Sequence, residues 1–344
     1  MSTPTPDNTS RRPRIGVYLP AYHLPEEAPP DARFLSEYAR HAEELGFDSL
    51  WVIDHLFVAP PSYRVAYLEP MTVLTIAAVA TSRLQVGTGI IVLPLRDPVL
   101  TAKALATVDA ISGGRVIFGA GVGWDPQEFA ACQIERKTRG RRMDEMLDVM
   151  TGLWANETFS YSGRHFRLDN VTLLPRPAQP RLPLWLAGGS VPGGTSQHIT
   201  AQKGYAPERS LQRVARYGDA LMSAYRSVPD GDATWLKQDR AILDRLLVDE
   251  GRDPSSLRHT IQDHMYINLS GSEDEIRERV ARFTFKPFEE IAPYYLLGTP
   301  ETIIPKLQGR LDAGIDEIAI NFIDPDPNQL DLFTQHIRPH LRMK

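Results

Sequence analysis

The chain has 344 residues, of which 42% are hydrophobic and 24% are charged, and its formal net charge is -5. This is the composition of a soluble globular protein, and it lacks the basic block that a nucleic-acid partner would require. Its one cysteine, Cys132, excludes an internal disulfide framework, and no apolar run is long enough to span a membrane. We therefore expect a cytoplasmic protein.

Residues 1–13 are polar and predict a disordered tail rather than a signal peptide, and residues 14–344 are predicted to form one domain. Within that domain, apolar runs alternate with amphipathic ones. Eight runs predict strands, over residues 14–19, 49–53, 84–92, 115–119, 184–187, 220–224, 260–269 and 317–322. The remaining periodic segments predict helices, over residues 34–45, 69–81, 98–111, 141–154, 210–217, 235–250, 273–285, 300–313 and 329–341.

Two segments interrupt this alternation. Residues 159–174 alternate around Gly163 and predict an inserted hairpin, whereas residues 190–208 are Gly-rich and polar and predict a long loop after the fifth strand. Eight strands that alternate with helices are most simply one (β/α)8 TIM barrel, with an open doubly wound sheet as the alternative. In a barrel, the chemistry lies at the carboxyl ends of the strands.

The third predicted strand contains two glycines, Gly87 and Gly89, in a run of β-branched residues. Glycine weakens a strand unless the backbone must bulge or another group must come close to it. The segment is therefore either the wall of a cofactor site or a buried strand end whose glycines serve packing.

Three further strand ends carry candidate groups. Asp54 and His55 follow the second strand, where an imidazole can move protons and a neighbouring carboxylate can orient it; the alternative is a strand-end histidine that is merely hydrogen-bonded. Residues 119–124 (GAGVGW) follow the fourth strand, and residues 188–190 (GGS) follow the fifth. Small residues let a ring or a phosphate approach the backbone.

Other chemistries find little support. The nine histidines form no HxH or HExxH pair, so we expect no metal site, and there is no GxSxG motif of a serine hydrolase. Asp263 and His264 are expected to act as a hydrogen-bonded pair, and Cys132 to be structural.

In chain order, these segments resemble the bacterial luciferase-like oxidoreductases, particularly their deazaflavin-dependent branch. The matching segments are RIGVYLP (14–20), HAEELGFDSLWVIDH (41–55), LQVGTGIIVLPLRDP (84–98), ISGGRVIFGAGVGW (111–124), RGRRMDEMLDVMTGLW (139–154), GRHFRL (163–168), LWLAGGS (184–190) and GTPETIIPKLQGRLDAGIDEIAI (298–320).

The resemblance implies a barrel that binds coenzyme F-420, or alternatively FMN, at its carboxyl-terminal mouth. It assigns proton transfer to His55, a coenzyme contact to Asp54 and a cis peptide bond behind the ring to Gly89–Ile90. The other coenzyme contacts that it implies fall on Val92, Val122, Gly123, Gln127, Gly188, Gly189 and Ser190. It also implies a homodimer.

Some positions depart from the family pattern. Luciferases have a phosphate-binding arginine where this chain has Val122 and a reactive cysteine where it has Gly121, and both differences favour the deazaflavin over FMN. Ala59 replaces an aromatic residue of the sugar-phosphate dehydrogenase relatives, which argues against that substrate. The loop after Gly189 is also longer than in the compact family pattern.

We therefore expect an enzyme that transfers hydride between F-420 and a small organic substrate, with His55 as proton donor or acceptor. The first alternative is an FMN monooxygenase that uses reduced flavin and O2, in a pocket with Phe57, Tyr63, Tyr67 and Trp124 as wall candidates. A non-catalytic flavin-binding protein and a metal-dependent hydrolase are alternatives from other classes.

Overall fold

The computed structural model describes residues 12–60, 62–189, 208–224 and 234–343. Most of the predicted tail and of the loop predicted over residues 190–208 lies outside these residues. Both therefore stay predictions.

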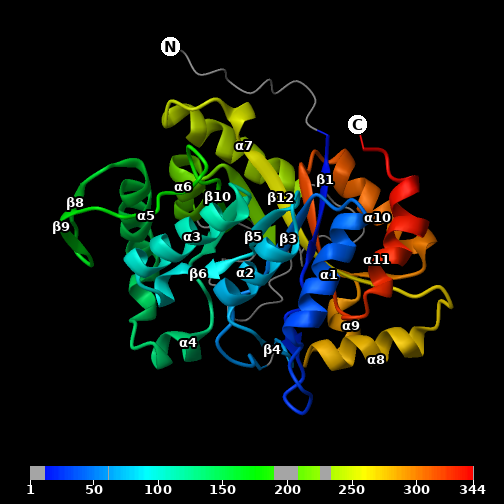
Figure 1. The fold of residues 1–344 in the computed structure, drawn as a ribbon. Coiled ribbons are helices and arrows are strands. Elements are labelled where there is room, and N and C mark those ends of the chain that lie inside the picture. Colours follow the sequence, from blue (N-terminus) through cyan, green and yellow to red (C-terminus); the bar gives the residue numbers. More distant parts are fainter. Residues whose placement is uncertain (1–11, 61, 190–207, 225–233, 344) are drawn as a thin grey trace.

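Eight parallel strands close into one barrel (Figure 1). Each pairs with two neighbours, and the circle is completed where the first strand pairs with the last and the fourth with the fifth. The TIM-barrel prediction is confirmed, and the open sheet is excluded because an open sheet has two edges. The strands are β1 Arg14–Tyr18, β3 Ser49–Val52, β5 Gln85–Thr88, β7 Val116–Gly121, β10 Leu184–Gly188, β11 Ala220–Ala224, β12 Arg258–Ile267 and β14 Glu317–Phe322.

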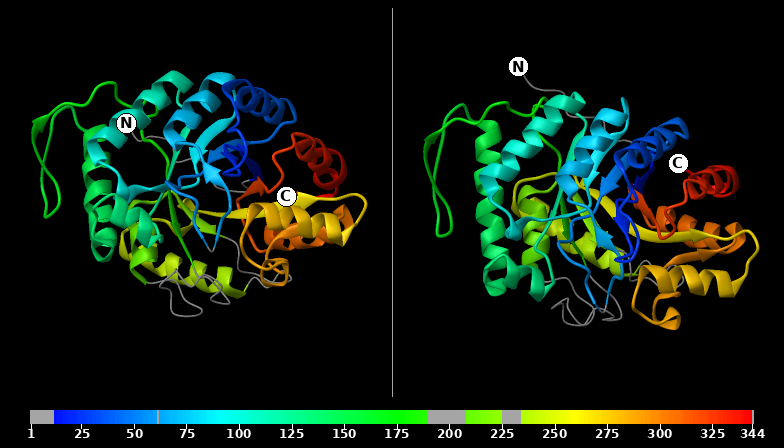
Figure 2. Two further views of the ribbon diagram at one scale, coloured as in Figure 1. Left: turned by 90° about the horizontal axis from the view of Figure 1, so that it is seen from below. Right: turned by 60° about the horizontal axis from the view of Figure 1, so that its bottom comes forward.

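Helices surround the barrel, as the view along its axis shows (Figure 2). Among the described helices, none combines the length and the apolar character needed to cross a bilayer. The longer ones are α1 Ala32–Glu44, α2 Pro70–Ala80, α3 Pro98–Ser112, α5 Arg139–Ala155, α6 Glu208–Tyr217, α7 Thr234–Asp249, α8 Glu273–Phe283 and α10 Pro300–Asp312. The last helix, α11 Asn328–Leu332, continues as a π-helical turn over Phe333–Ile337 and a 3-10 turn over Arg338–His340.

Shorter elements decorate this frame. The predicted hairpin is confirmed as β8 Phe159–Ser162 and β9 Arg167–Val171, which project beside α5 (Figure 1). The elements α4 Pro126–Ala131, α9 Phe288–Ile291, β2 Tyr22–His23, β4 Ala66–Tyr67 and β13 Leu296–Gly298 were not among the predicted helices and strands. Elements α4, α8, α9 and β4 lie at the lower end of the barrel in the view of Figure 1.

Two tryptophans, Trp51 and Trp185, lie in the barrel interior with their ring centroids 4.8 Å apart, in one cluster with other buried residues such as Tyr18 and Met222. Trp51 is fully buried, and a Cβ at Gly16 or Gly87 would lie 2.5 Å or 2.4 Å from its ring atoms. Real Cβ atoms do not approach other heavy atoms so closely. Gly87 therefore makes room for the Trp51 ring. At this position the glycine serves packing and does not form the wall of a cofactor site.

A buried polar network closes the amino-terminal end of the barrel. The Glu317 carboxylate accepts a hydrogen bond from Ser49 at 2.5 Å and pairs with Arg14 at 3.2 Å, and the Trp51 indole donates to Ser49 at 2.7 Å. Burial raises the pKa of Glu317, while the Arg14 charge lowers it. Since this end of the barrel is used for stability, the carboxyl ends of the strands remain for a functional site.

The third strand is not continuous as predicted. It stops at Thr88, the Gly89–Ile90 peptide bond is cis, and the chain resumes as β6 Ile91–Val92 beside β7. At the break, the Thr88 side chain pairs with the backbone of β7: its hydroxyl donates to the Gly119 carbonyl at 2.7 Å and accepts from the Gly119 N–H at 2.9 Å. The break places the Ile90 side chain at the mouth, partly buried on the barrel interior.

Candidate active site

The carboxyl ends of β3, β5, β7 and β10 lie side by side, because these strands are consecutive neighbours in the barrel. Direct contacts join them. Asp54 accepts a hydrogen bond from the Val92 N–H at 2.9 Å, which links β3 to β6. A Cβ at Gly121 would meet Ile90 at 2.7 Å and Ala187 at 3.1 Å, which links β7 to the break and to β10. Of the sequence-predicted site residues, these contacts bring Asp54, Ile90 and Val92 together at this mouth.

His55 is held by the carboxylate of Glu128, which lies in α4, the helix that follows β7. Its Nδ1 lies 3.1 Å from Glu128 Oε1, and the same oxygen accepts the Leu56 N–H at 2.8 Å. The side chain of Glu128 is 1% exposed and that of His55 is 10% exposed. His55 Nε2 has no hydrogen-bond partner among the described residues, so it is the ring nitrogen available to a ligand.

Three aromatic rings surround the His55 imidazole. The ring centroids of Tyr63, Tyr67 and Trp124 lie 5.6, 5.8 and 5.7 Å from that of His55. Burial, and then the neighbouring tyrosines, raise the pKa of Tyr67 far above its usual value, so its hydroxyl stays neutral. Of the four aromatic wall candidates, Phe57 alone is largely outside this group, with 45% of its surface exposed.

Asp54 does not orient His55, so that one of the two readings of this pair is wrong. Besides the Val92 N–H, its carboxylate accepts from the Arg96 guanidinium at 3.0 and 3.2 Å. Burial alone would lower the pKa of Arg96, but the charges of Asp54 and Glu69 raise it. Consecutive residues at the end of a strand point to opposite sides, which is why Asp54 and His55 have different partners.

The mouth has an apolar floor. Ile53 and Ile90 are partly buried and pack on the residues that fill the barrel. Beneath them, the Tyr18 hydroxyl donates to the Gly89 carbonyl at 3.0 Å, and a Cβ at Gly89 would lie 2.2 Å from that hydroxyl oxygen. Burial and then the Glu317 charge raise the pKa of Tyr18, which keeps this donor protonated.

The segment after β7 forms a second side of the mouth. Val122 is partly buried, and Gly123 has φ +72, where a Cβ would meet the Val92 side chain at 2.4 Å. Val92 itself is 2% exposed and its N–H is bonded to Asp54, so the predicted contact of Val92 with the coenzyme stays a prediction. Gln127 is exposed in the first turn of α4, and no described contact joins its side chain to the others.

The end of β10 supplies a third side. Gly188 is partly buried at the end of the strand, and Gly189 has φ +94, a conformation that favours glycine. A Cβ at Gly189 would lie 2.7 Å from the Ser223 hydroxyl and 3.1 Å from the Asp239 carboxylate. Ser190 lies outside the described residues.

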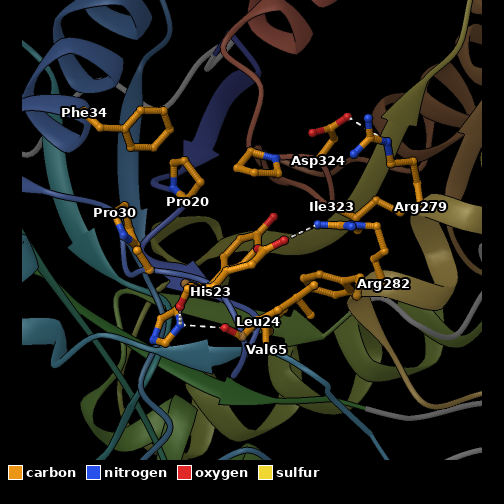
Figure 3. A pocket seen from close by; sticks show the side chains of 15 residues that line it. Pro20, His23, Leu24, Pro30, Phe34, Val65, Arg279, Arg282, Ile323 and Asp324 are labelled. Carbon is orange, nitrogen blue, oxygen red and sulfur yellow. Dashed lines mark hydrogen bonds and ion pairs between the residues drawn. The ribbon is translucent and has the colours of Figure 1, made fainter.

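A separate cavity of about 300 Å³ lies between the loop after β1, helix α8 and the end of β14 (Figure 3). Its charged residues are paired with one another: Arg279 with Asp324 at 3.2 Å, and Arg282 with Glu27 at 2.5 Å. The rest of its lining is mainly apolar.

A layer of rings lies between this cavity and His55. Tyr22 and Phe283 line the cavity, and their rings contact those of Tyr67 and Tyr63 at 5.9 Å each. Tyr63 and Tyr67 in turn contact His55. The cavity is therefore a neighbour of the mouth and is not the place where His55 would act.

Comparison with known proteins agrees with this fold and site. The sequence pattern of the luciferase-like monooxygenase family matches residues 14–295. The chain belongs to this family. Family members are oxidoreductase enzymes, which makes a non-catalytic binding protein or a metal-dependent hydrolase the wrong class.

The named relatives of this luciferase-like chain include F420-dependent dehydrogenases and an FMNH(2)-dependent monooxygenase. An F420-dependent glucose-6-phosphate dehydrogenase of Kineococcus radiotolerans is 29% identical, over 90% of this chain and 93% of the relative. An FMNH(2)-dependent dimethylsulfone monooxygenase of Pseudomonas putida is 26% identical, over 80% of this chain and 78% of the relative. A solved F420-dependent secondary alcohol dehydrogenase, in complex with an F420-acetone adduct, shares the fold with a TM-score of 0.74 at 21% identity and covers 96% of this chain and 99% of its own.

Glu128 is the site residue that the sequence did not reveal. It stands three residues after Asp125, which caps α4 by accepting the Gln127 N–H at 2.8 Å. An acidic residue at that position is typical of helix capping, so its pattern predicts a local role. Only the folded chain shows that it instead reaches Leu56 and His55 of the β3 loop.

Other candidate groups have structural partners. Asp263 forms a buried ion pair with Arg310 at 2.8 Å, while His264 stacks on Tyr295 with ring centroids 4.6 Å apart, so these two neighbours are not a hydrogen-bonded pair. Burial, and then the charges of Glu128 and Asp54, raise the pKa of Cys132. Within the described ranges, no three His, Cys, Asp or Glu side chains cluster as a metal site would require.

Proposed function

We propose that this enzyme transfers hydride between coenzyme F-420 and a small alcohol or carbonyl compound, with His55 as the proton donor or acceptor. The observation that carries the proposal is the placement of His55. Its imidazole is partly buried at the mouth, with Nδ1 held by Glu128 and Nε2 left without a partner among the described residues. Relatives named as F420-dependent dehydrogenases support the choice of coenzyme.

The described residues fit a flat, largely apolar ring. The floor of Ile53 and Ile90 is partly exposed, and the glycines Gly121 and Gly188 leave the strand ends beside it without side chains. A Cβ at Gly121 would meet Ile90, so a cysteine could not be placed there without moving the floor. We infer that the ring would lie on this floor, with backbone groups near Gly188 and Gly189 holding the phosphate part.

When bound, the deazaflavin supplies a two-electron hydride acceptor or donor. His55 Nε2 would take the hydroxyl proton of an alcohol as its carbinol carbon loses hydride, which leaves the carbonyl product; in reverse it would return the proton to the carbonyl oxygen. The rings of Tyr63, Tyr67 and Trp124 reduce the access of water to this proton transfer.

An FMN-dependent monooxygenase is the second candidate, favoured by the dimethylsulfone monooxygenase relative. We rank it second because Val122 cannot hold a phosphate as an arginine does.

A coenzyme titration of the purified protein tests the choice. We expect F-420 to bind at least 10-fold more tightly than FMN. Calorimetry measures the affinity of both, and the absorbance change of the deazaflavin gives a second measurement for F-420. The loaded enzyme is then assayed with a neutral secondary alcohol and with glucose 6-phosphate, and we expect the neutral alcohol to be the better substrate. Tighter binding of FMN would reverse the order of the two candidates.

The preference for a neutral substrate rests on two observations. Ala59, which stands in place of the relatives' aromatic residue, is 2% exposed and cannot contact a ligand. The cations of the neighbouring cavity, Arg279 and Arg282, are already paired with carboxylates. A higher kcat/KM for glucose 6-phosphate would contradict this part of the proposal.

We also propose a homodimer, and a cytoplasmic location that suits the unpaired Cys132. Helix α2 is apolar on all sides, and such a helix is normally covered on all sides. Its Val79 is 66% exposed, and on the adjacent α3 Leu100 and Ile111 are 72% and 53% exposed. A second copy of the chain would cover these side chains.

Light scattering should therefore give the mass of a dimer for the wild type and of a monomer for Leu100→Glu. Val248→Glu on α7 is the matched control, because Val248 is 63% exposed on another helix. A monomeric wild type at micromolar concentration would refute the dimer.

A further inference from the structure

We propose that Glu128 is the positioning residue that fixes which nitrogen of His55 carries the proton. This inference deepens the proposed function, since it gives the proton-transferring imidazole a defined tautomer. The adjacent carboxylate of Asp54 does not do this, because it is occupied by Arg96 and Val92.

The hydrogen-bond pattern sets the direction of the His55 contact. Glu128 Oε1 accepts from the Leu56 N–H at 2.8 Å, and this backbone donor anchors the carboxylate. A carboxylate has only acceptor oxygens, so the Nδ1 atom 3.1 Å away must be the donor. A neutral imidazole with a proton on Nδ1 has a lone pair on Nε2. Nε2 is therefore the atom that can take a proton from a substrate.

The burial of Glu128 strengthens this effect. Its side chain is 1% exposed, His55 is its only ion-pair partner among the described residues, and its second oxygen, Oε2, is buried without a hydrogen-bond partner. A buried carboxylate with so few donors gains most from a cation beside it. Glu128 is therefore the carboxylate that lies against His55 throughout a proton transfer at Nε2.

The remaining neighbours of His55 cannot replace Glu128. Tyr63, Tyr67 and Trp124 contact the imidazole through their rings, and each contact has a centroid separation above 5.5 Å. Such contacts hold the plane of the ring but do not distinguish its two nitrogens. Glu128 comes from α4, after β7, so this hydrogen bond joins the segments that follow two different strands at the mouth.

Nitrogen-15 NMR of histidine-labelled, coenzyme-free protein tests the proposal without any assay of activity. The His55 signals are assigned by their loss in His55→Ala. We expect the wild type to show the Nδ1–H tautomer, and Glu128→Gln and Glu128→Leu to gain the Nε2–H form. Asp331→Asn is the matched control, because Asp331 accepts from another histidine, His41, at 2.8 Å; it should leave the His55 signals unchanged.

Kinetics of the loaded enzyme give the second readout. We expect Glu128→Gln to lower kcat about 10- to 100-fold, as loss of the carboxylate partner does for metal-bound histidines, with unchanged affinity for the coenzyme. An Nε2–H tautomer in the wild type, or an unaltered His55 spectrum in the folded variants, would overturn the proposal. If the tautomer changes as expected but His55→Ala turns over normally, the positioning role stands and the proposed function fails.

Discussion

His55→Ala is expected to lower kcat about 10²- to 10⁴-fold, the usual contribution of a positioned acid or base. The variant loses the only imidazole whose free nitrogen lies at the described mouth, so the proton of the substrate hydroxyl has no acceptor. Coenzyme affinity should stay close to that of the wild type, because the apolar floor of Ile53 and Ile90 is untouched. Steady-state kinetics and a coenzyme titration separate the two effects.

His41→Ala is the control for this variant. His41 also pairs with a carboxylate, Asp331, but on α1 and with 32% of its side chain exposed. It should retain wild-type kcat. Equal turnover in His55→Ala and His41→Ala would remove His55 from the mechanism, whereas a loss confined to coenzyme binding would make His55 a binding residue.

Gly87→Ala is expected to destabilise the fold by about 1–3 kcal/mol, toward the upper end of that range. The new Cβ would lie 2.4 Å from Cζ3 and 2.6 Å from Cε3 of Trp51, an unexposed ring within the barrel. A rigid indole packed 4.8 Å from Trp185 has little room to retreat. Urea unfolding, followed by far-UV circular dichroism, measures the change.

Two further variants sharpen this test. Gly309→Ala in α10 meets nothing within 4 Å and removes a glycine from a helix, so it should be neutral or stabilise by up to about 1 kcal/mol. In a Trp51→Leu background, which removes the atoms that clash, Gly87→Ala should cost less than it does in the wild type. An equal cost in both backgrounds would show that the Trp51 contact is not the cause.

The element pattern was predictable because it is local. Hydrophobic runs such as that of Arg14–Tyr18 and amphipathic segments such as α5 follow directly from the spacing of their own residues. The exceptions were short elements. Strands β2 and β4 have two residues each and exist only because Tyr22 pairs with Tyr67 across the chain, which no local pattern reveals.

The candidate site was predictable in its positions but not in its contacts. Strand ends with Asp54, His55 and glycines are visible in the sequence, and a barrel brings the ends of its strands together. The partners of each side chain depend on which side of the strand it leaves. That is why Asp54 binds Arg96, while His55 binds a glutamate more than seventy positions away.

By itself, the sequence determined the alternation of eight strands with helices, the hairpin insertion and the family resemblance, since each depends on residues close together in the chain. The choice between a closed barrel and an open sheet came from the structure, because closure depends on the pairing of distant strands. Only the tertiary structure decided that Gly87 makes room for Trp51 and that Glu128 holds His55. Both are contacts between different strands or loops. Their physical cause is close packing and the burial of polar groups, which act between residues that only the closed barrel brings into contact.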